Sequence, residues 1–566
     1  MRLRCLVYAL LAAAVSATPT TWRRLERASH EESMELRIHL QPAQDLAAQL
    51  TAVADIASPT YGRYLESVDS IGHPTEEATA AMRALLQRYN PDVSLAGETW
   101  RVVMPVADVE VMFQTQVHSY GLQSRRVLRA TGDYSIPNCV APHVLVVDGL
   151  SHLPRSLTGR TRAVRRRLQS SNPMDTAVTI EKIQQQYRLP ADLDSSIDGN
   201  SMVIGTFLNE TYLESDIDSY MGFNRQMPLV AKPSQKSCMG GGRSGTATSE
   251  ASLDVQLLAG LTRNNDTTVL CYNELRLPNE PARDDNQEPF LQFMKDVNAL
   301  EKAPSVVSIS YADDECALPP AYRDAIDLEF IKAGLRGTTI VVASGDNGVV
   351  GSRFLEDFGV KFCTKYQPSY PSSSPYIVSV GATTVVGGRE VAVSIRSGGA
   401  ITTGGGFSSY APRPSYQAKV VDEYKGRHTL DVARFNSSGR AYPDVAAIGH
   451  NVQLFINGFN TMCDGTSASA PIVGAVISHM NKHRLQRGLP RLGFVNPYLY
   501  KLYEACPFVF NDVVNGENAC GALNQPCCAN GFAAGLGWDP IGGLGSINYE
   551  AFAQNMEKCE ALMKAS

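Results

Sequence analysis

From about residue 200 onward, short apolar runs alternate with longer stretches of helical apolar spacing. Four such runs, "SMVIGTFLN", "SVVSISYAD", "TTIVVASGDNG" and "YIVSVGATT", end in polar residues or glycine, and "PAYRDAIDLEFIKAGLRG" is an intervening helical stretch. Continuous apolar strands separated by amphipathic helices predict an α/β fold, with a parallel sheet covered by helices on both faces. Functional residues of such sheets gather beyond the carboxyl ends of the strands, where Asp313, Asp314 and Asp346 stand.

The pattern before residue 160 is different and contains no dense functional motif. "SMELRIHLQPA" is typical of a strand, "PTEEATAAMRALLQRY" of a helix with an acidic start, and "TWRVVMPVADVEVMF" of a strand followed by a helix. This order predicts a small α+β domain over residues 18–158. Residues 159–176 are basic and rich in turn-forming residues, which predicts a solvated linker.

The first 17 residues predict a cleaved secretory signal. Arg2 and Arg4 form a charged start, residues 5–15 an apolar run too short to span a membrane, and residues 15–17 a small-residue cleavage site. No later segment has about twenty consecutive apolar residues, so we expect a soluble mature protein without a membrane anchor. A nuclear-import role for the basic linker conflicts with the signal. We therefore interpret residues 159–176 as a processing junction between a prodomain (18–158) and a mature domain (177–566).

Length and charge limit the possible classes of function. A chain of 566 residues has room for two substantial domains, and its 44% hydrophobic content is that of a folded protein. The formal net charge of −6 gives no global basic field, so we expect no nucleic-acid partner.

The cysteines and the glycosylation sequons fit passage through the secretory pathway. Ten cysteines lie from Cys238 onward, an even number in an oxidising compartment, so disulfides are favoured, with their pairing left open. Zinc binding lacks support, because no paired CxxC motif or nearby histidine accompanies the cluster of Cys520, Cys527 and Cys528. Glycosylation of at least one acceptor is expected among Asn209, Asn265 and Asn436.

The stretch "CDGTSASAP" presents a candidate nucleophile. Ser467 lies just before an apolar-periodic run that predicts a long buried helix. Free backbone N–H groups and the positive end of the helix dipole would stabilise an oxyanion there. A serine at a helix start is more commonly an ordinary N-cap, but the Gly-Thr-Ser sequence followed by small residues and Pro471 resembles the way subtilisin-type peptidases present their serine.

The histidine that such a serine normally needs is missing. None of the ten histidines stands in a His-Gly-Thr-His setting like that of subtilisins, and six of them precede the linker. His479 and His483 follow Ser467 by more than two helical turns, so the spacing indicates a flanking pair. The ordinary Ser-His-Asp triad is therefore absent.

Carboxylates are the next candidates for the base. Glu250 and Asp254 are spaced i,i+4, which places both on one helix face and raises the pKa of one of them. A solvated acidic face is the common alternative, but the pair follows a glycine-rich loop and opens an apolar helix. In "VVASGDNG", Asp346 stands near the position of the asparagine that assists the oxyanion in subtilisins. An aspartate can donate there only when protonated, which favours acid; a turn aspartate is the alternative.

These motifs together resemble the sedolisins, the serine-carboxyl peptidases. The resemblance also includes "EASLDVQ", "SISYADDE", "GGGFSSYAPRPSYQ", "SGRAYPDVAA" and "GWDP", and it extends over nearly the whole chain after the signal. It implies a subtilisin-like α/β fold, with Ser467 as nucleophile and Glu250 as its general base. It further implies that Asp254 holds Glu250, that Asp346 is the oxyanion-hole acid, and that Asp313 has a supporting role.

The resemblance also implies one bound calcium ion near the C-terminus. Asp512 and Asp539 would supply carboxylate oxygens, and the remaining ligands would be the backbone carbonyls of Val513, Gly535 and Gly537. The alternative interpretation, which the residues alone would favour, is that these are two loop aspartates in a glycine-rich tail that binds no metal. The sequence departs from the family pattern at two places. Residues 543–546 read Gly-Leu-Gly-Ser where the family often has Gly-Trp-Gly-Thr, beside the expected calcium site. Gly351 stands where the most similar branch of the family has a disulfide cysteine, so the disulfide pairing of that branch cannot be assumed here.

The sequence thus predicts an acid peptidase made as a self-processing zymogen, inhibited by its own prodomain and cleaved within about residues 159–176. It would release tripeptides from free N-termini of peptides and unfolded proteins, with a pH optimum near or below about 5. We expect it in a lysosome-like acidic compartment or secreted. The alternatives are an acid endopeptidase of the same family, a non-catalytic pseudo-enzyme, and a polyanion-binding protein using the basic residues 165–167.

Overall fold

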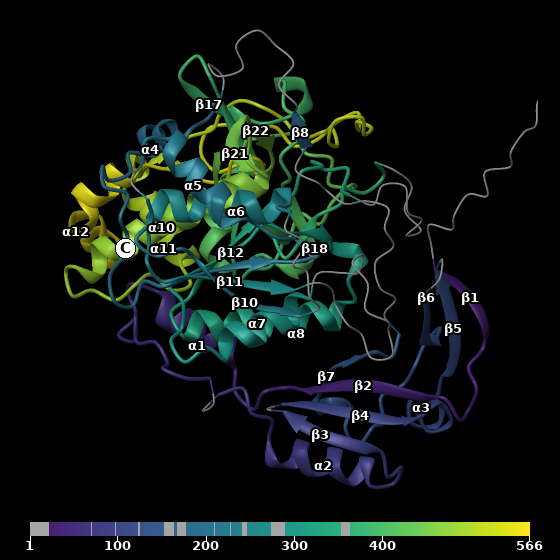
Figure 1. Ribbon diagram of the computed structural model, residues 1–566. Helices are drawn as coiled ribbons and strands as arrows, with labels where there is room; N and C mark the ends of the chain where they lie inside the picture. The colour runs from purple at the N-terminus through teal and green to yellow at the C-terminus, as the bar shows by residue number, and fades with distance from the viewer. Residues whose placement is uncertain are drawn as a thin grey trace, which may run out of the picture.

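The computed structural model describes residues 22–565, except 69–70, 97, 123–124, 152–163, 167–176, 209, 227, 240–245, 273–288 and 353–362. The signal predicted over residues 1–17 and most of the linker thus lie outside the described residues. Figure 1 shows a smaller N-terminal α+β unit, purple to blue, beside a larger unit built on a central sheet. No described helix is both long enough and apolar enough to span a bilayer.

The larger unit confirms the predicted parallel sheet. Its strands are ordered β10-β11-β9-β12-β14-β16, with β20 pairing in parallel to β16 and the edge strand β17 antiparallel to it. Every other pairing in this sheet is parallel. The strands are β9 (Met202–Thr206), β10 (Ser234–Met239), β11 (Thr267–Tyr272), β12 (Val306–Ile309), β14 (Thr339–Ala343), β16 (Val378–Val386), β17 (Arg389–Ala392) and β20 (Val445–Ile448).

Helices cover both faces of this sheet, as the alternation of strands and helices predicted. Helices α6 (Ser249–Thr262) and α10 (Thr466–Leu485) lie on one face, and α7 (Phe290–Asn298) and α8 (Pro320–Leu335) on the other (Figure 1). Successive residues of a strand point to opposite faces. Accordingly Val306 packs in the cluster that contains α6 and α10, whereas Val307 packs in the one that contains α7 and α8.

Further elements surround this core. The helices are α4 (Ile180–Tyr187), α5 (Glu214–Phe223), α9 (Ala418–Arg427), α11 (Asn496–Ala505) and α12 (Tyr549–Ala565). The strands form short antiparallel pairs: β13 (Asp313–Asp314) with β15 (Ser369–Tyr370), β18 (Gly406–Pro412) with β19 (Gly439–Tyr442), β21 (Val452–Ile456) with β22 (Phe459–Asp464), and β23 (Phe510–Asn511) with β24 (Ser546–Ile547).

The N-terminal unit is the predicted α+β domain. Four antiparallel strands are ordered β3-β4-β2-β7 and three more β1-β5-β6. Alternate residues of β2, such as Leu36 and Ile38, are buried, and Thr75 caps α2 by accepting from Ala78 N. The elements are β1 (Arg23–Arg27), β2 (Ser33–Leu40), β3 (Asp92–Ala96), β4 (Thr99–Pro105), β5 (Gln116–Leu122), β6 (Arg125–Thr131), β7 (Val144–Asp148), α1 (Leu46–Ala54), α2 (Glu76–Leu86) and α3 (Val106–Phe113).

The N-terminal unit docks on the outer face of α8. Leu50 of α1 packs with Leu335 and Phe494, and Leu65 N donates to Leu335 O at 2.9 Å. Burial in such a cluster removes apolar surface from water and so favours docking. The two units therefore share an extended apolar contact.

A buried ion pair adds to this contact. Lys332 Nζ lies 2.9 Å from Glu98 Oε1 of the N-terminal unit and 2.8 Å from Glu329 Oε1. Burial alone would raise the pKa of Glu98, but Lys332 and Lys295 lower it to about 2. A carboxyl group whose pKa is lower in the folded state than in the unfolded state stabilises the fold at any pH above its unfolded-state pKa. This stability is lost only as the pH falls towards the folded-state pKa. Mild acid therefore leaves this pair ionised, and any release of the N-terminal unit by mild acid must begin at other groups.

Three residues of the predicted linker form a short strand. Strand β8 (Val164–Arg166) pairs antiparallel with β22, with Arg165 opposite Cys463. Strand β22 leads directly into the Gly465-Thr466-Ser467 turn. The described part of the linker therefore lies beside the strand that precedes the candidate nucleophile.

Disulfides are present, as predicted, but not all of the ten later cysteines are paired. The bonds join Cys363 to Cys528, Cys506 to Cys559 and Cys520 to Cys527, and Cys271 is also disulfide-bonded. The buried Cys463 is not in a disulfide, so an even number of cysteines did not mean that each one is bonded. Count alone does not determine which cysteines the fold brings within bonding distance.

Candidate active site

Ser467 lies in the first turn of α10, just after the end of β22. Gly465 precedes the helix, Thr466 is its first residue, and Ser467 is 7% exposed. Its Oγ lies 3.2 Å from the backbone oxygen of Ser310, which follows β12. The hydroxyl of Ser310 in turn donates to Asp254 Oδ1 at 2.5 Å. The predicted nucleophile is thus placed at the carboxyl edge of the parallel sheet.

Glu250 and Asp254 are buried in the first half of α6, which excludes a solvated acidic face. Burial raises the pKa of Glu250, the charge of Asp254 raises it further, and a hydrogen bond with Ser467 lowers it. Burial also raises the pKa of Asp254, against the hydrogen bond from Ser310. Glu250 Oε1 and Asp254 Oδ2 are buried and have no hydrogen-bond partner among the described residues. A proton on either carboxyl would supply a donor that the other described residues do not.

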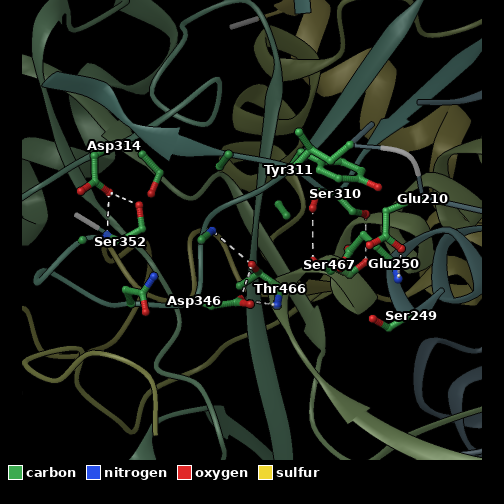
Figure 2. Close-up of a pocket in the computed structure, with 17 residues that line it drawn as sticks. Glu210, Ser249, Glu250, Ser310, Tyr311, Asp314, Asp346, Ser352, Thr466 and Ser467 are labelled. Carbon is green, nitrogen blue, oxygen red and sulfur yellow. Dashed lines mark hydrogen bonds between the residues drawn. The ribbon is translucent and has the colours of Figure 1, made fainter. Parts of the chain in front are cut away.

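Asp346 lies on the other side of Ser467 from Glu250, as Figure 2 shows. It follows β14, and its Oδ1 accepts from both the backbone N and the Oγ1 of Thr466, each at 2.8 Å. Burial raises the pKa of Asp346, the two bonds from Thr466 lower it, and the charge of Asp464 raises it. Asp346 is thus more than a turn residue, because its carboxyl is held against the helix that carries Ser467.

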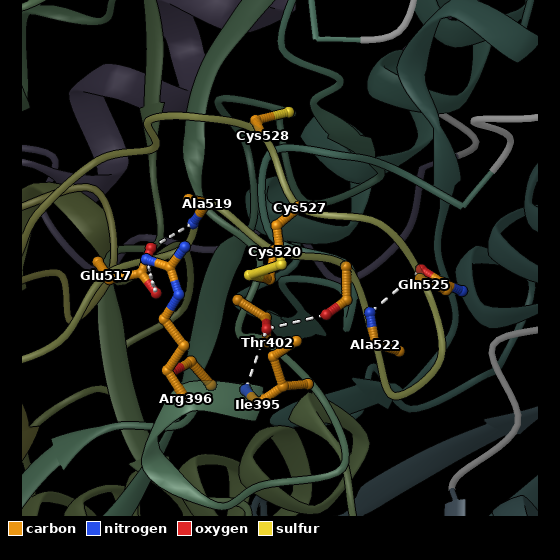
Figure 3. Close-up of a disulfide and its surroundings, with 12 residues drawn as sticks. Ile395, Arg396, Thr402, Glu517, Ala519, Cys520, Ala522, Gln525, Cys527 and Cys528 are labelled. Carbon is orange, nitrogen blue, oxygen red and sulfur yellow. Dashed lines mark hydrogen bonds and ion pairs between the residues drawn. A yellow bond between two sulfur atoms is a disulfide. The ribbon is translucent and has the colours of Figure 1, made fainter.

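The backbone of Asp346 is bonded to Thr402, which lies next to a disulfide between two nearby cysteines. Thr402 N donates to Asp346 O at 3.0 Å, and Thr402 Oγ1 donates to Gly521 O at 3.0 Å. Figure 3 shows Thr402 beside the bond between Cys520 and Cys527, which are seven positions apart. The C-terminal cysteine cluster therefore supports the segment that positions Asp346.

The pocket in front of Ser467 includes residues that the motifs did not single out. Glu210 Oε2 accepts from Glu250 N at 3.2 Å, and Tyr311 packs edge-on against Phe207 at 4.9 Å between ring centroids. Glu210 follows the end of the parallel strand β9, and Tyr311 follows the end of β12. Their positions beyond the carboxyl ends of strands could therefore have identified them as candidate site residues. The lining residues with polar side chains include Glu210, Ser310, Tyr311, Asp314, Ser352 and Thr466, of which Asp314 was already noted at the end of a predicted strand.

Asp314 faces this pocket, and the predicted supporting residue Asp313 is not among its lining residues. Asp313 Oδ1 accepts from Asp314 N at 2.8 Å. Asp314 Oδ1 accepts from Ser352 N at 2.8 Å and from Ser352 Oγ at 3.0 Å (Figure 2). The two neighbouring aspartates therefore have different surroundings, which the dipeptide alone did not reveal.

The residues predicted to bind calcium are brought together in the C-terminal loops. Asp512 Oδ2 accepts from Gly537 N at 2.8 Å, and Asp539 Oδ2 accepts from Gly535 N at 2.9 Å. Burial raises the pKa of Asp539 to about 7, and the charge of Asp512 adds to this effect. Within the described chain no group of three or more His, Cys, Asp and Glu side chains is placed to bind a metal.

The sequons differ in their surroundings. Asn209 lies outside the described residues, and Asn265 is exposed. Asn436 is half-buried, and its Oδ1 accepts from Ser438 Oγ at 2.7 Å. Of the two described sequons, Asn265 is the more accessible.

A subtilisin-like sheet with a serine at the start of its buried central helix, surrounded by carboxyl groups, defines a serine peptidase of the carboxyl type. Comparisons with known proteins agree. The family described as "Pro-kumamolisin, activation domain" matches residues 20–153, and the one described as "Subtilase family" matches residues 283–486.

Similar proteins cover nearly the whole chain. It is 33% identical over 591 residues to tripeptidyl-peptidase 1 of Canis lupus familiaris, covering 99% of this chain and 100% of that protein. It is 32% identical over 561 residues to tripeptidyl-peptidase 1 of Homo sapiens, covering 95% and 94%. Pseudomonas sedolisin shares the fold, with a TM-score of 0.51 and 20% identity over 68% of this chain and 98% of that one. The chain belongs to the sedolisin family of serine-carboxyl peptidases.

Replacing Glu250 by glutamine is expected to stabilise the protein near neutral pH. The pKa of Glu250 is higher in the folded state than in the unfolded state. The free energy of unfolding therefore falls as the pH rises from the unfolded-state pKa through the folded-state pKa. Glutamine has the shape of the protonated form and cannot ionise. We expect a gain of about 1–2 kcal/mol at about pH 7 that disappears near about pH 4.

Calorimetry of the full chain, with Ser467→Ala as the common background, measures this gain. Glu423→Gln, at an exposed position of α9, is the matched control. A loss of stability of equal size at both pH values would contradict the burial of an ionisable Glu250.

Proposed function

We propose that this serine-carboxyl peptidase works in acid, with Ser467 as nucleophile, and removes tripeptides from the free N-termini of peptides and unfolded proteins. The observation that carries the chemistry is the hydrogen bond between Ser467 and the buried Glu250, whose pKa is raised by burial and by the charge of Asp254. No histidine is among the residues that line the described pocket. The tripeptide specificity is supported by the relatives named tripeptidyl-peptidase 1.

Glu250 acts as the general base in this proposal. Its carboxylate takes the proton of Ser467 Oγ as the oxygen attacks the scissile carbonyl, and later gives that proton to the leaving amine. The unpartnered oxygens Glu250 Oε1 and Asp254 Oδ2 belong to residues one helical turn apart on α6. One proton shared by the pair leaves a single negative charge, which two buried carboxyls can hold more easily than two charges. Ser310 fixes Asp254 through its hydroxyl.

Asp346 supplies the hydrogen bond to the oxyanion. Its Oδ1 is already engaged by two donors from Thr466, so a proton on this carboxyl belongs on Oδ2. Oδ2 lies 3.6 Å from the position that a Cβ on Gly465 would occupy, next to the Ser467 turn. A protonated aspartic acid is a donor, and an ionised one repels the oxyanion. Activity is therefore lost as Asp346 ionises.

The N-terminal unit is the activation domain of the zymogen and inhibits the mature domain until it is released. Its docking on α8 and the pairing of β8 with β22 beside the Ser467 turn support this role. Cleavage falls within residues 159–176. A self-processing enzyme adapted to acid belongs in a lysosome-like compartment or an acidic secretion.

A peptide substrate with a free amine distinguishes tripeptide release from endopeptidase activity. A tripeptide amide with a free N-terminus should be cleaved at least about 100-fold faster than its N-acetylated form, since a site built for a buried ammonium rejects a neutral cap. Mass spectrometry of a longer peptide should show sequential loss of three-residue units.

The Ser467→Ala enzyme is the control for both substrates and should lose cleavage of each by at least about 10³-fold. Equal cleavage of free and acetylated substrates would favour the acid endopeptidase. A Ser467→Ala protein that retained hydrolysis and self-processing would contradict the assignment of the nucleophile.

We also propose one calcium ion, held by Asp512 and Asp539 with backbone carbonyls of Val513, Gly535 and Gly537. The fit rests on the two carboxylates that the loops bring together, of which Asp539 is fully buried. Hard carboxylate and carbonyl oxygens are the ligands that calcium prefers. When bound, the ion would neutralise these like charges and hold the loop against the core; it takes no part in peptide cleavage.

Removing calcium should therefore lower thermal stability. At a calcium concentration of 100 times Kd, binding contributes about 2.7 kcal/mol, so EGTA should lower Tm by several degrees and added Ca²⁺, but not Mg²⁺, should restore it. Asp539→Asn should abolish this response, and Asp422→Asn, at an exposed ion pair, should leave it intact. An EGTA-treated protein with the Tm of the calcium-loaded one would contradict the site.

A further inference from the structure

Asp464 is a buried carboxylate that the mechanism above does not use, although it stands three residues before Ser467. Its Oδ2 accepts from Ala400 N at 2.7 Å and pairs with His450 Nδ1 at 2.9 Å. Its Oδ1 accepts from Asn451 N at 2.8 Å. A buried carboxylate with this many donors is held in the ionised form.

These bonds join three segments around the oxyanion site. Asp464 ends β22, His450 belongs to the loop after β20, and Ala400 belongs to the loop that continues to Thr402. The first two segments also meet through Gly465 N, which donates to Gly449 O at 2.9 Å. The third segment supports Asp346 through Thr402 N. Asp464 therefore connects, through hydrogen bonds, the turn that contains Ser467 and the loop that bonds to the backbone of Asp346.

The charge of Asp464 reaches Asp346 as well. Burial alone would raise the pKa of Asp464, but the bonds from His450, Asn451 and Ala400 hold it below its ordinary value. The charge of Asp464 is in turn one cause, after burial, of the raised pKa of Asp346. The other ionisable groups here are Glu250, whose pKa the charge of Asp346 raises, and the thiol of Cys463, whose pKa burial and the surrounding carboxylates raise.

We propose that Asp464 and His450 are a positioning pair behind the oxyanion site: the pair fixes the Ser467 turn and keeps a negative charge beside Asp346, which holds Asp346 in its protonated, donating form. This inference rests on the proposed function. In this proposal His450 lies near the nucleophile but positions Asp464 and does not act as a general base. His450 bonds to Asp464 and Asn451, and Asp464 transmits its effect through Thr466 and Asp346.

The test is the pH dependence of kcat/KM for the processed enzyme and its variants. In Asp464→Asn the charge beside Asp346 is lost, so Asp346 ionises earlier and the alkaline limb should move to lower pH by about half a unit or more. His450→Gln keeps a neutral donor to Asp464 and leaves the charge of Asp464 in place, so the limb should move by less than in Asp464→Asn. Asp422→Asn, which also removes a paired aspartate but at an exposed position, should not move the limb.

The outcomes separate this pair from the proposed function. An acidic wild-type optimum, with an alkaline limb that moves to lower pH in Asp464→Asn and moves less in His450→Gln, supports the pair. A uniform fall of kcat/KM at every pH, with limbs that coincide with that of the wild type, shows a merely structural role and overturns it. If Asp464→Asn does not fold, Asp464→Ser, which also removes the charge, is measured in its place and decides by the same criterion. A wild-type optimum at neutral pH overturns the proposed function together with the pair.

Discussion

Burial of carboxyl groups around the start of α10 is the constraint on which the site depends. Glu250, Asp254 and Asp346 are all removed from water, and a buried carboxyl must be protonated or receive hydrogen bonds. Glu250 Oε1 and Asp254 Oδ2 receive no hydrogen bond from the described residues, and Thr466 gives both of its hydrogen bonds to Oδ1 of Asp346. Protons can satisfy carboxyl oxygens that lack donors, and this supports the proposal that the enzyme works in acid.

The fold produces this crowding by packing two helices on the same sheet face. Helix α6 carries Glu250 and Asp254, and α10 carries Ser467, so the contact between these helices sets the distance between base and nucleophile. Small residues make this approach possible: a Cβ on Gly474 would lie 3.3 Å from Val341 Cγ2 and 3.4 Å from Leu258 Cδ1. Ser310 then links the two helices at the end of β12. Catalytic geometry and core packing therefore depend on the same interface.

Much of this arrangement could be predicted from local pattern. The alternation of strands and helices predicted the covered parallel sheet, and spacing within single helices and loops indicated Ser467, Glu250 and Asp254 as neighbours in the chemistry. Contacts between distant segments could not be predicted in this way. Cys363 bonds to Cys528 across 165 positions, and Asp464, although part of the quoted nucleophile motif, shows its role only when His450 and Ala400 are placed beside it. Asp313 and Asp314 look equivalent in sequence because the direction of each side chain depends on the β13–β15 pairing.

The central claim is that carboxyl groups, and not a histidine, activate the serine and stabilise the oxyanion. The most direct measurement is kcat/KM of the processed enzyme on a free-amine tripeptide amide from about pH 3 to about pH 8. The account predicts a maximum near or below about pH 5 and a fall on the alkaline side as Asp346 ionises. A maximum at neutral pH would contradict it.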